Sequence, residues 1–317
     1  MTIKSIKWKI IIMALCLFQA NSCFSKDAYR TMETYLNQAR TDNHFVPPSP
    51  EELHRVKKLF YRLLKGERGN HIVQDWKELH FSMEEITCAG RTYVLLVEEP
   101  DHRTGRGMYL FPQNPRGNQV LMIPHGLHDY YTSDIGIQLT LEGDFAATVF
   151  NSVHRYGNRK KNPQEPRERM TEGKSTSGKE KTWDMAALPD TCFTAFTQAF
   201  IKAFPGGTLM QLHGFSPKNR KTPEGRESDI IISAGTKNTS VRAGQSRDCL
   251  KEKVPGKIRL YPDEIQELGG TRNIIGATLR AAGHRGFLHI EINYSMRKKI
   301  KSNPKIRGYF LDCITGL

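Results

Sequence analysis

The sequence predicts an α/β fold in which helices alternate with the strands of a largely buried sheet. Short apolar runs bounded by turn residues recur along the chain, and such runs are typical of buried strands. Segments with helical periodicity lie between them, as expected when helices cover a sheet. The chain of 317 residues, 38% hydrophobic and 25% charged, can bury a sizeable core. No clear linker divides it, so we expect one catalytic domain with an N-terminal helical extension.

The first 22 residues are typical of an export signal. Three lysines within residues 1–9 precede a short apolar run from Ile10 to Phe18, and Ala20-Asn21-Ser22 supplies small residues suited to cleavage. The apolar run is too short for a transmembrane helix. Cys23 follows directly, so a lipoprotein and an incidental cysteine both stay open. We expect an exported protein that is periplasmic, secreted or held at the outer envelope, with membrane contact only through a lipid on Cys23.

A helical extension is expected over residues 23–80. Two segments within it, Ala28–Arg40 and Pro50–Leu64, have apolar residues at helical spacing. The second segment has a strong start signal, because Ser49 can serve as N-cap and proline occupies the first helical position.

The catalytic domain is expected over residues 81–317. Apolar runs predict strands at Met83–Thr87, Thr92–Glu98, Gly107–Phe111, Asn118–Ile123, Phe145–Phe150, Leu209–Leu212, Ser228–Ala234 and Phe287–Asn293. Helices are predicted at Thr132–Leu141 and Asn273–Ala282, with a helix-rich stretch at Asp184–Phe204. Residues 157–183 are polar and basic and have almost no apolar side chain, which predicts a mobile loop.

The formal net charge of +14 first suggests a nucleic-acid partner. Much of the basic excess, however, lies in segments predicted to be loops, and no DNA- or RNA-binding motif accompanies it. We therefore expect no nucleic-acid partner. A basic surface that attracts an acidic substrate or an anionic polymer of the cell envelope is the better interpretation.

The cysteines indicate one or two disulfides rather than a metal site. Exported proteins oxidise their cysteines. Four lie beyond the first 23 residues: Cys88, Cys192, Cys249 and Cys313. Their wide spacing contains no CxxC pair, which argues against cysteine ligands, and it leaves the pairing open.

Histidines follow two of the predicted strands. Asn118–Ile123 runs into Pro124-His125-Gly126, and Leu209–Leu212 runs into His213-Gly214. Active sites of open α/β sheets collect at the carboxyl ends of strands, and zinc is bound by imidazoles and carboxylates. A single histidine in a turn is more often structural, but two at equivalent strand ends favour a metal site.

The predicted zinc ligands are therefore His125 and His213, with a third ligand close to His125 in the sequence. Asp129 offers the more common carboxylate chemistry, and His128 is the alternative at a three-residue offset. The sequence leaves the choice between Asp129 and His128 open.

Glu291 is the predicted catalytic base. It lies in the apolar strand Phe287–Asn293, where a carboxylate is costly to bury unless it is paired or used. There it could accept a proton from the attacking water and pass it to a leaving amine. The alternative is an alternating strand in which Glu291 and His289 face solvent.

Arg155, beside Asn151, is the predicted binder of a substrate carboxylate and stabiliser of an oxyanion. Arg297 is a second candidate for the same anion-binding role. Asp184 is interpreted as a helix N-cap.

Taken together, several of these motifs resemble the N-formylglutamate amidohydrolase group, which is related to zinc carboxypeptidases. The resemblance covers roughly Leu121 to Ser302. It rests on Pro124-His125-Gly126 with Asp129 and Thr132, Asn151 with His154-Arg155, Leu212-His213-Gly214-Phe215, and His289-Ile290-Glu291-Ile292-Asn293. It implies a three-layer α/β/α fold with a mixed central sheet, metal ligation by His125 and His213, catalysis assisted by Glu291, and substrate binding by Arg155.

The sequence therefore predicts an exported zinc-dependent amidohydrolase or carboxypeptidase-like hydrolase. It would cleave a C–N amide bond of an acidic substrate, such as an N-acyl amino acid, a γ-glutamyl chain or a peptide, with Glu-assisted attack of metal-activated water. Two alternatives are a non-catalytic envelope protein that binds anionic polymer and a metal-dependent hydrolase of an ester bond.

Overall fold

The computed structural model describes residues 27–42, 44–156 and 183–316. The predicted export signal, Cys23 and nearly all of the predicted basic loop lie outside the described residues. Within them, the strands form one sheet in the order β1-β2-β3-β5-β4-β6-β9-β7-β8. None of the described helices is long and apolar enough to cross a membrane.

The sheet is mixed, with an antiparallel edge and a parallel centre. The antiparallel edge consists of β1 (Phe81–Cys88), β2 (Arg91–Glu98) and β3 (Met108–Pro112), with β3 antiparallel to β5 (Ala147–Phe150). The parallel centre consists of β5, β4 (Gln119–Ile123), β6 (Thr208–Phe215) and β9 (Phe287–Asn293). At the far edge β7 (Ile230–Ser233) is antiparallel to β9 and parallel to β8 (Ile258–Leu260).

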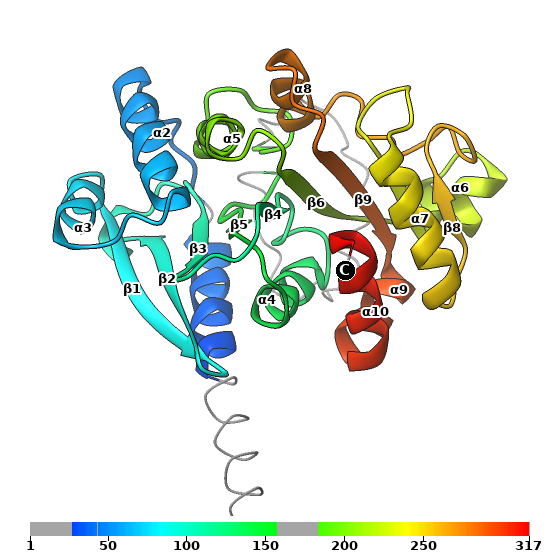
Figure 1. Cartoon of the computed structure of the whole chain (residues 1–317), viewed down its shortest axis with the longest axis horizontal. Helices are drawn as coiled ribbons and strands as arrows, with labels where there is room; N and C mark the ends of the chain where they lie inside the picture. Colours follow the sequence, from blue (N-terminus) through cyan, green and yellow to red (C-terminus); the bar gives the residue numbers. More distant parts are fainter. Residues whose placement is uncertain (1–26, 43, 157–182, 317) are drawn as a thin grey trace, which may run out of the picture.

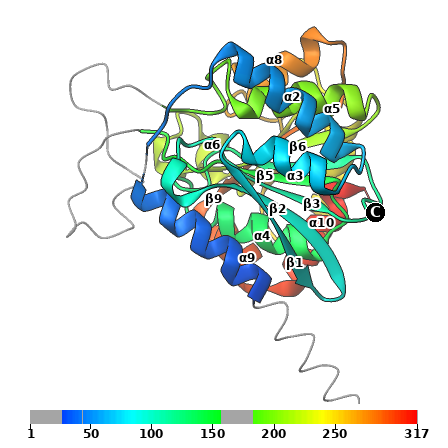
Figure 2. The ribbon, with the colours of Figure 1, turned by 90° about the vertical axis from the view of Figure 1, so that its left-hand side faces the viewer.

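Helices cover both faces of this sheet, so the predicted three-layer α/β/α fold with a mixed sheet is confirmed (Figures 1 and 2). One face packs against α2 (Pro50–Leu64), α3 (Asn70–Lys77), α5 (Cys192–Ala203) and α8 (Ile274–Ala281). The other packs against the helix of residues 27–42, α4 (Thr132–Glu142), α7 (Val241–Lys253), α9 (Tyr294–Ser302) and α10 (Pro304–Thr315). The remaining short elements are η1 (Pro100–His102), η2 (Pro217–Asn219) and α6 (Pro223–Glu227).

The predicted helix Pro50–Leu64 is confirmed with the same bounds. The Ser49 side chain accepts a hydrogen bond from the backbone of Glu52, whose carboxylate accepts one from the backbone of Ser49 at 2.7 Å. This capping box satisfies amides that have no partner inside the helix. The buried Phe60 then packs edge-on against Phe196 of α5, with ring centroids 5.3 Å apart. The N-terminal helices thus share a core with the sheet.

Two boundaries differ from the prediction in ways that affect the site. β6 continues through His213 to Phe215 because these residues pair with β9, so His213 lies within a strand and not past its end. In the predicted helix-rich stretch, α5 begins only at Cys192, where Thr191 is the N-cap. Asp184 therefore lies in a turn before the helix and does not cap it.

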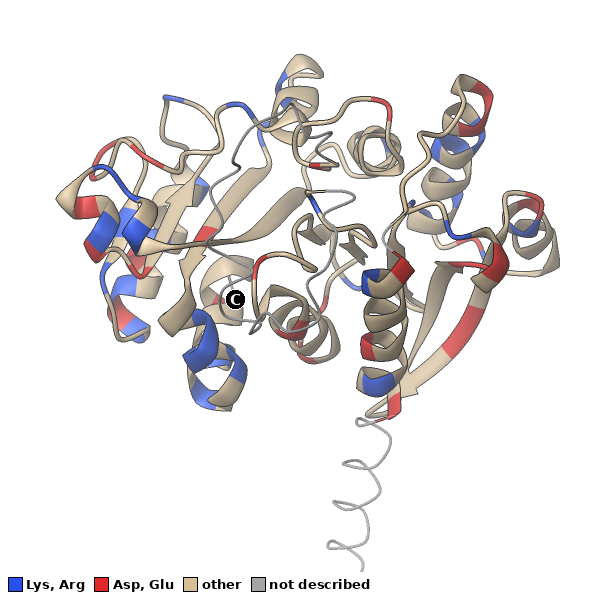
Figure 3. Cartoon of the chain, turned by 180° about the vertical axis from the view of Figure 1, so that it is seen from behind, with Lys and Arg blue, Asp and Glu red and all other residues tan. Residues whose placement is uncertain are grey.

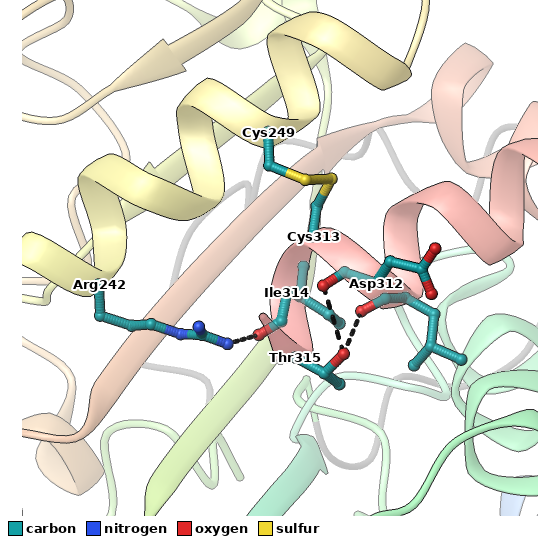
Figure 4. Close-up of a disulfide and its surroundings, with 7 residues drawn as sticks. Arg242, Cys249, Asp312, Cys313, Ile314 and Thr315 are labelled. Atoms are coloured by element: carbon teal, nitrogen blue, oxygen red, sulfur yellow. Dashed lines mark hydrogen bonds between the residues drawn. A yellow bond between two sulfur atoms is a disulfide. The ribbon is translucent and has the colours of Figure 1, made fainter. Parts of the chain in front are cut away.

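One disulfide joins Cys249 of α7 to Cys313 of α10 (Figure 4). Next to it, the guanidinium of Arg242 donates to the carbonyl oxygen of Ile314, which adds a second link between the same two helices. Cys88 and Cys192 are buried and take no part in this disulfide. The sequence left the pairing of these four cysteines open; in the structure, Cys249 and Cys313 form the single disulfide among them.

Candidate metal centre

Polar side chains interrupt one face of the central strands near their carboxyl ends. In the parallel pairing of β6 and β9, Gln211 is opposite His289 and His213 is opposite Glu291. Because side chains alternate along a strand, these four point to the same face, the one covered by α5 and α8. All four are buried, with exposed fractions between 0% and 8%. Such groups are costly to bury without a use or a partner.

The turn after β4 brings two more groups to this point. The amides of His128 and Asp129 both donate to the carbonyl oxygen of His125, which closes a tight turn. Asp129 then accepts a hydrogen bond from the backbone of Gly214 at 2.8 Å. As a result the Nδ1 atoms of His125 and His213 lie 3.2 Å apart, and Asp129 Oδ2 lies 3.5 Å from His125 Nδ1. One potential ligand atom from each of these three side chains lies within 4.8 Å of the other two.

The protonation of His213 follows from its outer neighbours. Asn273 is the N-cap of α8, and its Oδ1 accepts hydrogen bonds from the amides of Ile275 and Gly276. Its Nδ2 is therefore the atom that donates to Gln211 Oε1, at 2.6 Å. Because Gln211 Oε1 is an acceptor, His213 Nε2 at 3.1 Å must carry the proton. The lone pair of His213 is then on Nδ1, which faces His125 and Asp129.

His125 is oriented in the same way by a carboxylate. Its Nε2 lies 2.8 Å from Asp184 Oδ1, so Nε2 donates and Nδ1 faces the centre. Asp184 also forms an ion pair with Arg155 and accepts from the amide of Ala186. A histidine whose outer nitrogen donates to a carboxylate is the usual arrangement of a metal ligand, because the hydrogen bond fixes the ring and its tautomer.

The charges at the centre favour a cation. Burial lowers the pKa of His125, but hydrogen bonds to Asp129 and Asp184 outweigh this effect and raise the pKa to about 9. Burial raises the pKa of Asp129, yet His125 holds it well below its usual range. In His213, burial and the neighbouring His289 hold the pKa well below its usual value, so this ring stays neutral. Two imidazole nitrogens and one carboxylate oxygen are a donor set that fits a zinc ion with open coordination positions.

Glu291 lies next to this cluster in a buried environment. Its Oε1 is 3.8 Å from His289 Nε2, and its Oε2 has no hydrogen-bond partner among the described residues. It also forms a group with His213 and His289, in which one potential ligand atom of each residue lies within 4.8 Å of the other two. Burial first, and then the charge of Asp129, raise the pKa of Glu291 to about 8. The structure does not have the solvent-facing arrangement considered from the sequence, because His289 and Glu291 are 3% and 8% exposed.

The other predicted residues lie around the cluster in different roles. His128 is directed to His154, with 3.3 Å between ring nitrogens, and the structure brings Asp129 rather than His128 to His125 and His213. Asn151, predicted at the substrate, is 1% exposed and donates through its amide to Pro124 O and Val153 O. It therefore fixes the turn that carries His125.

The two arginines differ in their access to solvent. The Arg155 side chain is 28% exposed and forms an ion pair with Asp184. Arg297 is only 4% exposed, donates to Ile292 O at 2.8 Å, and lies over Gly214 beside Asp129. In this structure Arg297 is buried, and its charge acts on the carboxylate of Asp129.

Asp184, Gln211 and Asn273 are the members of the cluster that sequence reasoning missed. Asp184 meets His125 across 59 residues, and Asn273 meets Gln211 across 62 residues. The only local signal was Asn273, whose place before an apolar helical segment predicts an N-cap but not its second contact.

No family model and no curated protein sequence matches the chain. Among solved structures, it is similar to a gene product of Agrobacterium tumefaciens, with 18% identity, a TM-score of 0.38, and coverage of 64% of this chain and 90% of that one. A candidate carboxypeptidase from Burkholderia mallei gives 11% identity, a TM-score of 0.40, and coverage of 86% and 70%. A candidate carboxypeptidase A from Shewanella denitrificans gives 11% identity and a TM-score of 0.34, with coverage of 76% of this chain and 65% of that one.

Proposed function

We propose that this protein is a zinc-dependent hydrolase that cleaves a C–N amide bond of an acidic substrate, such as an N-acyl amino acid, a γ-glutamyl chain or a peptide. The observation that carries the proposal is the convergence of two histidine Nδ1 atoms, 3.2 Å apart, on the carboxylate of Asp129. Both outer Nε2 atoms face fixed acceptors, so both Nδ1 atoms face the position of the ion; His125, whose pKa is raised to about 9, would release its Nδ1 proton when the cation binds.

His125, Asp129 and His213 would hold the metal. Three protein ligands are the number found in catalytic zinc sites, where further positions stay open for water or substrate. When bound, zinc supplies a Lewis acid that polarises a carbonyl and makes water more acidic. The resemblance to N-formylglutamate amidohydrolases, which stays a prediction, agrees with this set of ligands.

Glu291 would move the proton. A carboxyl group with a pKa near 8 can be in either form near neutral pH, and catalysis requires that it accept a proton and later donate it. Its unpaired Oε2 is buried at the cluster, where an attacking water would need an acceptor. Glu291 would take the proton of that water and return it to the leaving nitrogen, so the amide nitrogen departs as a neutral amine.

Arg155 would bind the anionic part of the substrate. Its side chain reaches solvent and is anchored to Asp184, which in turn orients His125. A guanidinium can bind a carboxylate through two parallel hydrogen bonds, which gives both charge and direction. An acidic group next to the scissile bond would therefore be placed beside the metal ligands.

The first test is the metal content of the purified chain, measured by elemental mass spectrometry after dialysis against a weak chelator. We expect close to one zinc per chain, lost in His213→Ala and kept in His71→Ala, because His71 is an exposed residue of α3. Hydrolysis of N-acyl glutamates, γ-glutamyl peptides and matching esters would then be followed by amine or alcohol release. Wild-type protein that takes up no zinc even when zinc is supplied would refute the proposal.

A further inference from the structure

A second cluster of metal-binding side chains lies at the antiparallel edge of the sheet, away from the centre described above. His80 directly precedes β1, and Glu99 and His102 follow β2, the latter within η1. The two strands are antiparallel with Phe81 opposite Glu98, so the beginning of β1 and the end of β2 are adjacent. Figure 1 shows these strands at the outer edge of the sheet, separated from β6 and β9 by the strands between them.

The side chains of this cluster bring their ligand atoms close together, but the two rings are stacked rather than directed at a common point. The rings of His80 and His102 stack with centroids 3.8 Å apart and planes inclined by 16°. His80 Nδ1 lies 3.7 Å from Glu99 Oε2, and one ligand atom from each of the three residues falls within a common 4.8 Å. Ligand atoms about 2.1 Å from a tetrahedral ion are about 3.4 Å apart, so the spacing suits an ion, and rotation of one imidazole out of the stack would direct both lone pairs to it.

Backbone hydrogen bonds fix the positions of the three residues relative to one another. The amide of Glu99 donates to His80 O at 2.8 Å, and the amide of His102 donates to Glu99 O at 3.0 Å. His80 has a φ of 59°, an uncommon value for a residue other than glycine, and its own amide donates to Lys77 O. The three side chains therefore start from fixed positions, while their exposure leaves them room to rotate. The side chains of His80 and Glu99 are 54% and 29% exposed.

The charges around the cluster leave it available to a cation. Among the described residues, Glu99 has an ion-pair contact with His80 and with no lysine or arginine. Two imidazoles and one carboxylate form a donor set that suits zinc, nickel and copper better than magnesium or calcium.

We propose that His80, Glu99 and His102 form a second site for a divalent transition ion, which clamps the open end of the β1–β2 hairpin. The ion would link the residue before β1 to the turn after β2, and so stabilise the outermost pair of strands. The proposal does not depend on the hydrolase activity, because none of these residues belongs to the candidate metal centre.

The test is a calorimetric titration of the full chain that has first been loaded with one equivalent of zinc. Further Zn²⁺, and in a parallel run Ni²⁺, should bind as one additional equivalent to wild type and to a His54→Gln/His71→Gln control, in which two exposed histidines of α2 and α3 are replaced. The His80→Gln/His102→Gln variant should lose that equivalent, and Mg²⁺ should give none. Absence of the additional equivalent in wild type, or its retention in His80→Gln/His102→Gln, would overturn the proposal.

The clamp has its own readout, because an ion that binds the folded protein preferentially raises its melting temperature. Excess Zn²⁺ should raise the melting temperature of the zinc-loaded wild type and control, and leave that of His80→Gln/His102→Gln unchanged. Hydrogen exchange of the amides at Phe81 and Glu99 should slow on addition of Zn²⁺ in wild type and in the control, and not in His80→Gln/His102→Gln. Equal exchange with and without the ion would refute the clamp.

Discussion

Glu291 shows how a single buried carboxyl group can tie stability to pH. In the metal-free protein its pKa is about 8, whereas an unfolded chain leaves the pKa near its ordinary value of 4.5. At pH values between 4.5 and about 8, Glu291 is protonated in the folded state and has lost its proton in the unfolded state. The free energy of unfolding therefore falls as pH rises through this window, with a limiting slope of about 1.4 kcal/mol per pH unit.

We expect Glu291→Gln to remove this contribution. In urea unfolding of chelator-treated protein, the stability of the variant relative to wild type should increase steadily from pH 5 to pH 8. Glu85→Gln, which replaces an exposed residue of β1, is the control and should show no such trend. A constant difference between Glu291→Gln and wild type over this range would show that Glu291 is not protonated in the folded protein.

Asp184 carries the second prediction at this scale. The substitution Asp184→Asn keeps the size of the side chain but removes the charge that orients His125 and balances Arg155. Loss of such an outer contact costs about 10- to 100-fold in metal affinity. Competition with a fluorescent zinc chelator measures this loss, and the exposed Asp190→Asn should bind zinc as wild type does. Unchanged affinity in Asp184→Asn would mean that His125 does not depend on this carboxylate.

At the scale of elements, the contact between β6 and α9 depends on the absence of a side chain at Gly214. A Cβ there would lie 1.5 Å from Arg297 Nη1 and 3.0 Å from Asp129 Cβ. We expect Gly214→Ala to displace Arg297 and destabilise the protein by about 1–3 kcal/mol, the range for overpacking. Gly244→Ala in α7 is the matched control, because a Cβ there meets nothing within 4 Å and alanine favours a helix by about 1 kcal/mol. Urea denaturation of both variants gives the comparison, and a stable Gly214→Ala would contradict the packing.

The disulfide between α7 and α10 is the other contact that can be tested at this scale. It bridges residues 64 apart in the sequence. A disulfide that closes a loop of this size typically raises the free energy of unfolding by about 2–4 kcal/mol. We expect Cys249→Ala/Cys313→Ala to lose this amount in urea unfolding. Reductant should lower the stability of wild type toward that of the variant, and it should leave the variant unchanged. A variant as stable as oxidised wild type would show that Arg242 and the helix packing suffice.

How well each element could be predicted depended on whether its cause is local. The strand Phe287–Asn293 and the helix Pro50–Leu64 were found because apolar runs and a capping box lie within the segment itself. The end of β6 was missed because His213-Gly214 has the composition of a turn and becomes strand only through pairing with β9. α7 was missed because most of its residues are polar and few of them are buried.

At the scale of the whole molecule, the candidate site joins segments that no local pattern connects. The sequence predicted His125, His213 and Asp129 from their chemistry and from the rule that sites collect at strand ends. It could not predict that Asp184, Gln211 and Asn273 orient these rings, because those contacts exist only after the sheet and α8 are assembled. The candidate ligands were thus predictable as residue types, with the choice between Asp129 and His128 left open, and their orientation was not.

The charge of the molecule is distributed differently from what its total suggests. Figure 3 shows basic and acidic residues interspersed along the ribbon of the described part of the chain. Several of them form ion pairs. This mixed pattern differs from a continuous basic track along which a polyanion could bind. The expectation of no nucleic-acid partner stays a prediction, and titration with DNA and RNA at two salt concentrations would check it.

The hydrogen-bonded chain from Asn273 through Gln211 to His213 also has an evolutionary consequence. Substitution of any one of these residues removes a hydrogen-bond donor or acceptor from the chain. The neighbouring residue then loses its hydrogen-bond partner. Single substitutions along the chain should therefore be tolerated poorly, while simultaneous replacement could restore a consistent set. Among homologous chains we expect positions 211, 213 and 273 to change together or not at all, so that the start of a helix is inherited jointly with a candidate metal ligand.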